Sequence, residues 1–267
     1  MARRRLDTEL VRRGLARSRQ HAADLVAAGQ VTVAGVVATK VATQVDMAAP
    51  VQVTAEPVGQ AYASRGAHKL IGALDAFETQ GLVVAGRRCL DAGASTGGFT
   101  DVLLRRGAAV VVAVDVGYGQ LDWRLQSDER VVVHDRTNVR DLTVEMIGGP
   151  VDLVVADLSF ISLRLVLPAF DRVTTPEADL VLMVKPQFEV GREALPSGGV
   201  VRDPLVREEA VASVGEGAEA AGWGALGVVA SPLPGPAGNV EYFLWLRRGA
   251  RALDRAAISR AVEEGPQ

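Results

Sequence analysis

From Arg88 onward, short continuous apolar runs alternate with stretches of helical spacing. The apolar runs are "RCLDAG", "AVVVAVDVG", "RVVVHD", "VDLVVADLSF", "ADLVLMVKP", "GALGVVAS" and "EYFLWLRR". The stretches between them, such as "GFTDVLLRRG" and "PLVREEAVASVGEGAEAAG", repeat their apolar positions at helical intervals. Strands that are apolar on both faces and separated by helices are typical of a parallel sheet covered on both sides. The pattern therefore predicts an α/β domain with a seven-stranded sheet that ends in an antiparallel pair around "SPLPGPAGN".

The N-terminal part of the chain has a different pattern. Apolar residues over 6–20 follow helical spacing, and "SRQHAADLVAAG" begins with Ser18 as an N-cap and ends at Gly29. "QVTVAGVVATK" alternates around Gly35, as a hairpin does. We therefore expect three segments: a small α+β module over 1–60, a linker over 61–66 and the α/β domain over 67–267.

Positive charge is concentrated in the N-terminal module. The formal net charge of the whole chain is only -3, but its first forty residues are strongly basic. The basic residues there are Arg3, Arg4, Arg5, Arg12, Arg13, Arg17, Arg19 and Lys40, against the acidic Asp7, Glu9 and Asp24. A basic module on a mildly acidic body indicates that the module binds a polyanion.

The remaining composition limits the class of protein. Cys89 is the one cysteine, so neither an internal disulfide nor a cysteine zinc site can form, and we expect a reducing compartment and no metal. A secretory signal has an apolar stretch after its basic residues, and "MARRRLDTEL" has none after its arginines. No apolar run reaches the about 20 residues of a membrane helix. We expect a cytoplasmic protein that does not enter membranes.

A glycine-rich turn, "LDAGASTGGFTD", joins the first strand of the α/β domain to its first helix. A single turn of this kind is as often a plain tight turn as a ligand site. Asp115 and Asp135, however, follow the next two strands, and ligands of such sheets bind where those strands end. The spacing differs from the dinucleotide fingerprint and suits S-adenosylmethionine, with Asp115 on the ribose and Asp135 on the adenine. The expected cofactor residues are Asp91, Gly93, Ser95, Thr96, Gly97, Gly98, Phe99, Asp115 and Asp135.

Three more charged residues stand at strand ends. Asp157 ends one strand, Lys185 ends the next and Glu241 opens the last. Each alone is compatible with a helix cap, a solvated cation or an edge charge, but together they border one expected crevice. A buried lysine beside another cation can act as a general base for a ribose hydroxyl or stabilise its anion.

These motifs resemble those of the TlyA/hemolysin A family of rRNA 2′-O-methyltransferases over nearly the full chain. "RLDTELVRRGLARSRQHAADLVAAGQVTVAG" is similar to an S4 RNA-binding domain. "SRGAHKL", "LDAGASTGGFT", "DVGYGQL", "DLSFISL", "VKPQFE" and "GNVEYFLWL" are similar to blocks of the FtsJ/RrmJ-type methyltransferase domain. The resemblance implies a Rossmann-like class I methyltransferase fold, S-adenosyl-L-methionine as cofactor, and ribosomal RNA or ribosomal subunits as partner.

The resemblance also implies roles for single residues. The family's catalytic Lys-Asp-Lys-Glu tetrad corresponds to Lys69, Asp157, Lys185 and Glu241, with Lys185 as the main base. Phe160, and with it Phe188, is a candidate for stacking on a displaced base, although a place in the core is equally compatible. The expected RNA contacts are Arg3, Arg4, Arg19, Lys40, Arg65 and Phe160. Family members of the actinobacterial type methylate cytidine in 16S and 23S rRNA, which makes ribosomes sensitive to capreomycin and viomycin.

Two other functions remain as alternatives. One is a non-catalytic RNA-binding or ribosome-assembly factor with a decayed methyltransferase fold, but a decayed site would have lost some of its strand-end residues. The other is a membrane-active hemolysin, against which stands the lack of a long apolar or cationic amphipathic segment.

Overall fold

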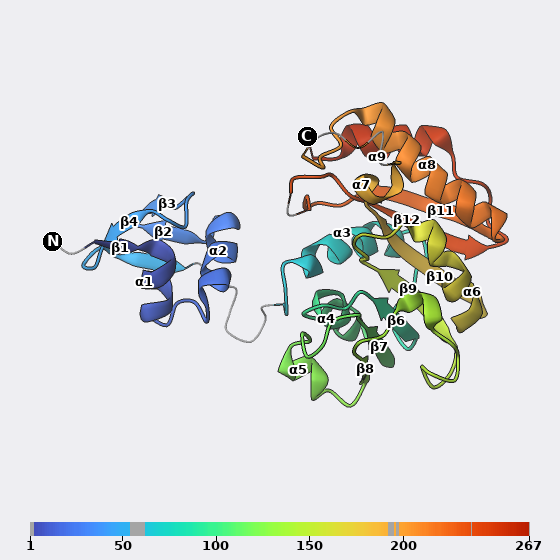
Figure 1. The fold of residues 1–267 in the computed structure, drawn as a ribbon, viewed down its shortest axis with the longest axis horizontal. Helices are drawn as coiled ribbons and strands as arrows, with labels where there is room; N and C mark the ends of the chain where they lie inside the picture. Colours follow the sequence, from blue (N-terminus) through green and yellow to red (C-terminus); the bar gives the residue numbers. More distant parts are fainter. Residues whose placement is uncertain (1–2, 54–61, 192–194, 196–197, 236, 267) are drawn as a thin grey trace. The chain divides into compact units, whose positions relative to one another are not determined.

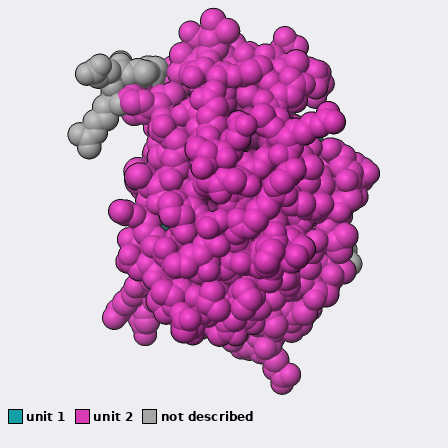
Figure 2. Space-filling view, turned by 90° about the vertical axis from the view of Figure 1, so that its right-hand side faces the viewer, with its two compact units in different colours: residues 1–61 teal, residues 62–267 magenta. Residues whose placement is uncertain are grey.

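The computed structural model describes residues 3–53, 62–191, 195, 198–235 and 237–266 (Figure 1). The chain separates into two compact units, one over residues 1–61 and the other over residues 62–267. Figure 2 shows one face of the second unit, in magenta. Of the expected linker, Ala61 lies outside the described residues. Tyr62 onward belongs to the second unit, where the Ala63 N–H donates to Asp101 Oδ2 at 2.8 Å.

The first unit is a small α+β module. Its elements are β1 (Arg3–Arg5), α1 (Leu6–Arg12), α2 (Arg19–Ala27), β2 (Val31–Val33), β3 (Val36–Val37), β4 (Gln44–Asp46) and β5 (Val51–Val53). β1 pairs with β4, and β2 lies between β3 and β5 in a three-stranded sheet. The Ser18 side chain accepts the N–H of His21 at the start of α2, and Gly29 has the left-handed φ of 67° that ends it. The expected N-cap, helix end and hairpin are therefore confirmed.

The second unit is built around a seven-stranded sheet in the order β11-β12-β10-β9-β6-β7-β8. Its strands are β6 (Arg88–Ala92), β7 (Val110–Val114), β8 (Val131–His134), β9 (Val151–Ala156), β10 (Thr174–Val184), β11 (Trp223–Ala230) and β12 (Tyr242–Arg248). β12 runs antiparallel to both of its neighbours, and the pairs from β10 to β8 are parallel. The predicted seven-stranded, mostly parallel sheet with an antiparallel C-terminal pair is confirmed.

Helices cover both faces of this sheet. The helical segments are α3 (Gly66–Glu78), α4 (Gly98–Arg105), α5 (Trp123–Gln126), η1 (Val139–Asp141), η2 (Leu163–Leu165), α6 (Leu167–Val173), α7 (Pro186–Glu189), α8 (Pro204–Ala220) and α9 (Arg255–Glu264). One apolar core joins alternate strand residues to α3, α4 and α5, and another joins the remaining ones to α6, α8 and α9. Cys89 is fully buried in the first of these cores, as expected of a strand residue.

The C-terminal helix α9 was not predicted from the sequence. It buries Ile258, Ala261 and Val262, which lie at helical spacing, and Asp254 caps its first turn by accepting the Ala256 N–H. Its polar residues outnumber these apolar ones, which hides the pattern. No described helix is long and apolar enough to cross a bilayer.

Candidate methyltransferase site

The glycine-rich turn after β6 is shaped by close packing. Gly93 has a φ of 88°, and a Cβ there would lie 2.4 Å from the backbone oxygen of Asp157. At Gly97, with a φ of 95°, a Cβ would collide with Leu125, and at Gly98 it would collide with Ser64. The glycines therefore let the turn lie against β9, α5 and the start of α3, and Gly93 holds it directly against Asp157.

A pocket of about 520 Å³ opens where β6, β7 and β9 end. Its lining comprises Gly93, Ser95, Val114, Asp115, Val116, Gln120, Asn138, Val139, Asp157, Leu158, Ser159, Phe160, Ile161 and Val166. Asp115 accepts backbone N–H groups from Ser95 at 2.8 Å and from Gly117 at 2.7 Å, so the turn after β7 fixes its carboxylate. The pocket lies at the carboxyl edge of the parallel strands, where ligands of such sheets bind.

Asp91 belongs to β6, two residues before the lining residue Gly93, and is fully buried. Its Oδ2 accepts the Thr100 hydroxyl at 2.7 Å, whereas its Oδ1 has no hydrogen-bond partner among the described residues. Burial, reinforced by the charges of Asp157 and Asp115, raises the pKa of Asp91 to about 7.

The other expected cofactor residues, Thr96, Gly97, Gly98, Phe99 and Asp135, are not among those that line the pocket. The Phe99 ring packs in the core, 6.1 Å from that of Phe243. The Asp135 carboxylate turns back to accept the Gly119 N–H at 2.9 Å, and this bond ties the end of β8 to the loop after β7. On the side of the pocket toward β8, Asn138 and Val139 are the lining residues.

The four residues of the expected tetrad form two ion pairs. Lys185 Nζ lies 2.6 Å from Asp157 Oδ1, and Lys69 Nζ lies 2.5 Å from Glu241 Oε2. The Lys69–Glu241 pair is almost fully buried, whereas the Asp157 side chain keeps 24% of its surface exposed toward the pocket. Lys185 Nζ also donates to Ser159 Oγ at 2.9 Å.

The sheet explains how these residues come together. Val184, the last residue of β10, pairs with Tyr242, the first residue of the antiparallel β12. Lys185, just after β10, and Glu241, just before β12, therefore lie at the same edge of the sheet. Pro186 begins α7, ends the strand and leaves Lys185 as the helix N-cap. Lys69 comes from the buried face of α3, a helix that packs against β10 and β12 on one face of the sheet.

Two phenylalanines stand beside the first ion pair. Phe160 is 90% exposed, has a left-handed φ of 63° and lines the pocket. Its ring centre lies 5.1 Å from that of Phe188, and Lys185 Nζ lies 6.0 Å from the centre of the Phe188 ring. Because Phe160 is so exposed, the alternative that it belongs to the core is wrong.

The expected RNA-contacting cations lie mostly on the surface. Arg4, Arg19 and Lys40 of the first unit are exposed, and Arg19 also forms an ion pair with Asp7 at 3.0 Å. Arg3 lies in β1, which pairs with β4. Arg65 is the exposed N-cap of α3 in the second unit. His68 of the same helix stacks edge-to-face with Tyr62, with the ring centres 5.8 Å apart.

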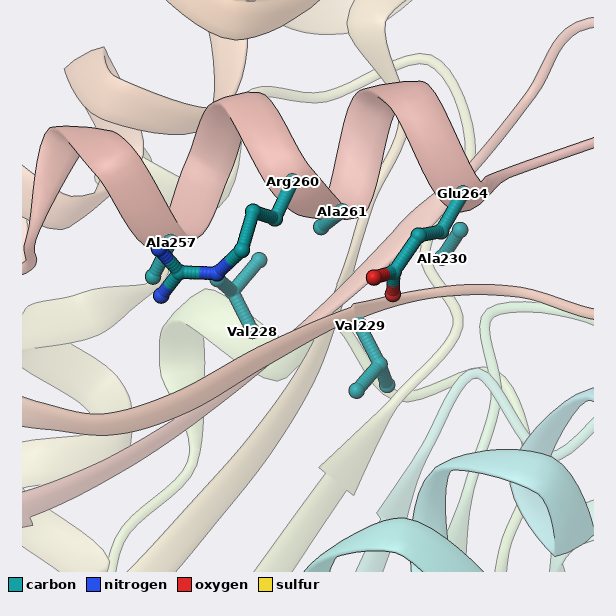
Figure 3. A pocket seen from close by; sticks show the side chains of 7 residues that line it. All are labelled: Val228, Val229, Ala230, Ala257, Arg260, Ala261 and Glu264. Carbon is teal, nitrogen blue, oxygen red and sulfur yellow. The ribbon is translucent and has the colours of Figure 1, made fainter.

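A second cavity, of about 250 Å³, lies between β11 and α9 (Figure 3). Its lining consists of Val228, Val229, Ala230, Ala257, Arg260, Ala261 and Glu264. Arg260 and Glu264 extend from α9 over the strand in Figure 3, and the other lining side chains are small and apolar. This cavity contains none of the residues expected from the sequence.

Sequence reasoning missed Ser159, Gln120 and Asn138, all of which line the large pocket. Ser159 stands two residues after Asp157 and Asn138 three after Asp135, so proximity to a strand-end carboxylate was the available signal. In the part of the chain that the structure describes, no three His, Cys, Asp or Glu side chains form a group that could hold a metal ion.

Two family models and several known proteins match this chain. An FtsJ-like methyltransferase family model matches residues 62–248, and an S4 domain model matches residues 4–49. The 16S/23S rRNA (cytidine-2′-O)-methyltransferase TlyA of Mycobacterium tuberculosis is 60% identical over the full length of both chains. Hemolysin A of Brachyspira hyodysenteriae is 36% identical, with 89% of this chain and 97% of that protein covered.

A solved structure agrees with these sequence matches. A structure described as that of a hemolysin from Streptococcus thermophilus superposes with a TM-score of 0.76 at 35% identity, covering 99% of this chain and 96% of that one. The matches therefore cover both units, and they include proteins named for rRNA methylation and proteins named for hemolysis. The chain belongs to the FtsJ-like methyltransferase family, in its TlyA/hemolysin A branch with an N-terminal S4 domain.

Proposed function

We propose that this protein transfers a methyl group from S-adenosylmethionine to the ribose 2′-oxygen of cytidine in ribosomal RNA. One observation carries the proposal: Asp157 and Ser159 line the large pocket and also hold Lys185 Nζ. A candidate proton acceptor is thereby fixed at the rim of a candidate cofactor site. The name of the 60% identical M. tuberculosis relative supports cytidine in 16S and 23S rRNA as the target.

The pocket suits S-adenosylmethionine in size and in chemistry. Asp115, with both carboxylate oxygens oriented by backbone N–H groups, is suited to accept the two ribose hydroxyls. Asn138 offers an amide on the side expected for the adenine, and Val139 and Ile161 give apolar lining. Asp91, two residues before the lining residue Gly93, has an unpartnered buried oxygen and provides negative charge for a bound cation. Bound there, S-adenosylmethionine supplies an electrophilic methyl group on a sulfonium and leaves as the neutral thioether.

The residues around Lys185 perform the proton chemistry in this proposal. The 2′-hydroxyl of the target ribose donates its proton to the neutral Nζ of Lys185 as the carbon–oxygen bond forms. Asp157, 2.6 Å from Nζ, orients the amine and stabilises the ammonium that results. Lys69, held by Glu241, places a second cation at the same edge of the sheet, where it stabilises the developing alkoxide.

RNA recognition is divided between two sets of side chains in this proposal. Arg3, Arg4, Arg19 and Lys40 of the S4 unit, with Arg65, contact phosphates and position the substrate. Phe160, exposed at the rim of the pocket, stacks on the displaced cytosine so that its ribose reaches Lys185. Because its substrate is ribosomal RNA, we expect the protein to act in the cytoplasm, on ribosomal subunits.

Methyl transfer to ribosomal subunits tests this function directly. Tritium from labelled S-adenosylmethionine should enter rRNA with the wild-type protein and not with Lys185→Ala. Mapping of ribose methylation should then place the mark on cytidine in the 16S and 23S rRNAs. No incorporation by the wild type would favour the non-catalytic RNA-binding factor, and full activity of Lys185→Ala would remove Lys185 from the chemistry.

A further inference from the structure

Lys185 has a second hydrogen-bond acceptor besides its carboxylate partner. Its Nζ donates to Asp157 Oδ1 at 2.6 Å and to Ser159 Oγ at 2.9 Å. Both acceptors come from the loop after β9, two residues apart, whereas Lys185 follows the adjacent strand β10. The Lys185 side chain keeps only 9% of its surface exposed, so few alternative partners compete for its protons.

The number of acceptors matters because a lysine that accepts a proton must be a neutral amine. Such an amine has two N–H bonds and one lone pair, arranged tetrahedrally with the Cε–Nζ bond. With Asp157 as sole acceptor, Nζ can rotate about Cε–Nζ, and the lone pair then samples several directions. When both N–H bonds have acceptors, the lone pair occupies the one direction that remains.

We propose that Ser159 is a positioning residue for methyl transfer, which together with Asp157 directs the lone pair of Lys185 toward the ribose hydroxyl. The inference rests on the proposed function and adds to it a residue outside the Lys-Asp-Lys-Glu tetrad. Ser159 does not itself exchange the reacting proton. It acts through the orientation of Nζ, on which proton transfer depends because bond formation needs aligned orbitals.

The local backbone holds Ser159 in this orientation. The next residue, Phe160, has a φ of 63°, a left-handed conformation that bulky side chains rarely adopt. With this bend, Ser159 Oγ contacts Lys185 while the following ring contacts Phe188, three residues after Lys185. Two side-chain contacts therefore join the two loops, which is the kind of over-determined geometry in which local strain persists.

A merely structural role, or a contact with the cofactor, predicts different kinetics. Loss of a structural bond would lower stability and leave the pH–rate profile unchanged. Since Ser159 also lines the pocket, loss of a cofactor contact would raise the Kd for S-adenosylmethionine and leave kcat unchanged. Loss of lone-pair orientation lowers kcat, because the proton transfer occurs in the transition state.

The test compares Ser159→Ala, Ser159→Thr and Ser159→Val in the full-length protein with rRNA substrate. Thr and Val have nearly the same shape and differ in the hydroxyl, so this pair isolates the hydrogen bond from packing. We expect Ser159→Ala and Ser159→Val to lower kcat by roughly 10- to 100-fold, since small misplacements of reacting groups cost up to about that much. Ser159→Thr should recover most of this loss, and the Kd for S-adenosylmethionine should stay within about twofold in all three, as for an interaction confined to the transition state.

The pH–rate profile supplies the readout that a structural role would not move. An acceptor stabilises an ammonium more than an amine, so its removal should shift the rising limb of the profile to lower pH in the Ala and Val variants. Ser162→Ala is the matched control, because the Ser162 hydroxyl lies on the same loop but bonds to Glu189 Oε2 at 2.5 Å. Its profile should coincide with that of the wild type.

The outcomes separate this inference from the function on which it rests. If the wild type transfers methyl groups in a Lys185-dependent manner and Ser159→Val equals Ser159→Thr in kcat and profile, Ser159 has no positioning role. A raised Kd with unchanged kcat would make Ser159 a cofactor contact instead. If the wild type transfers no methyl group, the proposed function itself fails and this inference fails with it.

Discussion

Lys69 and Glu241 lie 172 residues apart in the chain and form an ion pair of 2.5 Å between Nζ and Oε2. The lysine comes from the first helix of the second unit and the glutamate from the approach to its last strand. Their side chains are 10% and 1% exposed, so neither charge is stabilised by bulk water. The pair thus ties the first helix of the methyltransferase unit to the start of its last strand and places a cation at the candidate catalytic edge.

Breaking this pair should cost both stability and activity, and the two losses can be separated. We expect Glu241→Gln or Lys69→Met alone to lower the free energy of unfolding by about 3–5 kcal/mol, because each leaves a buried charge without its partner. The double variant Lys69→Met/Glu241→Gln removes both charges and should recover much of that stability. Urea unfolding of the three variants measures the effect.

Methyl transfer by the double variant provides the decisive comparison. If Lys69 acts in catalysis, the double variant stays inactive although its stability has returned. A double variant that regained both stability and activity would show that the pair is only structural.

The sheet and its strand-end residues were predictable from the sequence because they depend on local pattern. Continuous apolar runs identify buried parallel strands, and a charged residue that closes such a run must lie at the sheet edge. Asp157 and Lys185 were found in this way, and their ion pair follows from the adjacency of β9 and β10.

The partner of each charged residue was not predictable in the same way. The Lys69–Glu241 pair requires β12 to lie between β10 and β11, and it requires α3 to turn Lys69 toward the sheet. Neither follows from hydrophobic spacing. Asp135 shows the same limit, since its position after β8 does not reveal that its carboxylate accepts the Gly119 N–H from the neighbouring loop.

Asp91 should make the stability of the protein depend on pH. Its pKa is about 7 in the folded protein, against an ordinary value of 3.8, so between these pH values the folded state holds a proton that the unfolded state releases. The free energy of unfolding therefore falls as pH rises through this window, by about 4 kcal/mol for the full difference. Asp91→Asn keeps an acceptor for Thr100 but does not titrate. Its free energy of unfolding should exceed that of the wild type at pH 8 and should not exceed it at pH 4.

Urea unfolding of both proteins across that range is the measurement, and Thr100→Val is the control. Thr100 donates to the charged carboxylate and thereby lowers its pKa, so its loss should move the stability decrease to higher pH. If wild type and Asp91→Asn differed by the same amount at every pH, the titration would belong to another group.

Gly93→Ala should disrupt the site through the backbone of Asp157. The new Cβ would lie 2.4 Å from the Asp157 oxygen, and the φ of 88° is unfavourable for alanine. Relief of this collision must move Asp157 and with it the Lys185 pair, so we expect methyl transfer to fall by about 100-fold, as for other small displacements of catalytic groups. Gly222→Ala is the matched control, because its φ of 86° carries a similar backbone cost with nothing within 4 Å of the new Cβ.

Both variants should lose about 1–2 kcal/mol of stability from the left-handed backbone alone, and Gly93→Ala should lose more. Thermal unfolding and methyl transfer on the same samples distinguish the two costs. Equal activity in the two variants would mean that the Asp157 backbone adjusts to the extra methyl group without displacing the site.

The exposed cations of the S4 unit should contribute to RNA affinity in a salt-dependent manner. Arg4→Ala and Lys40→Ala each remove one exposed charge, and we expect each to reduce the slope of log K against log salt by about 1. Arg19→Ala should behave differently, because Arg19 also pairs with the nearly buried Asp7 and its loss removes a stabilising interaction of the unit. Filter binding of rRNA over a salt series measures the slopes, and unfolding of the same variants detects the added cost at Arg19.

Phosphate contacts carry no sequence information, so the methylated nucleotide should be unchanged in all three variants. A shift of the modified position in Arg4→Ala would instead make that side chain a reader of RNA sequence or shape.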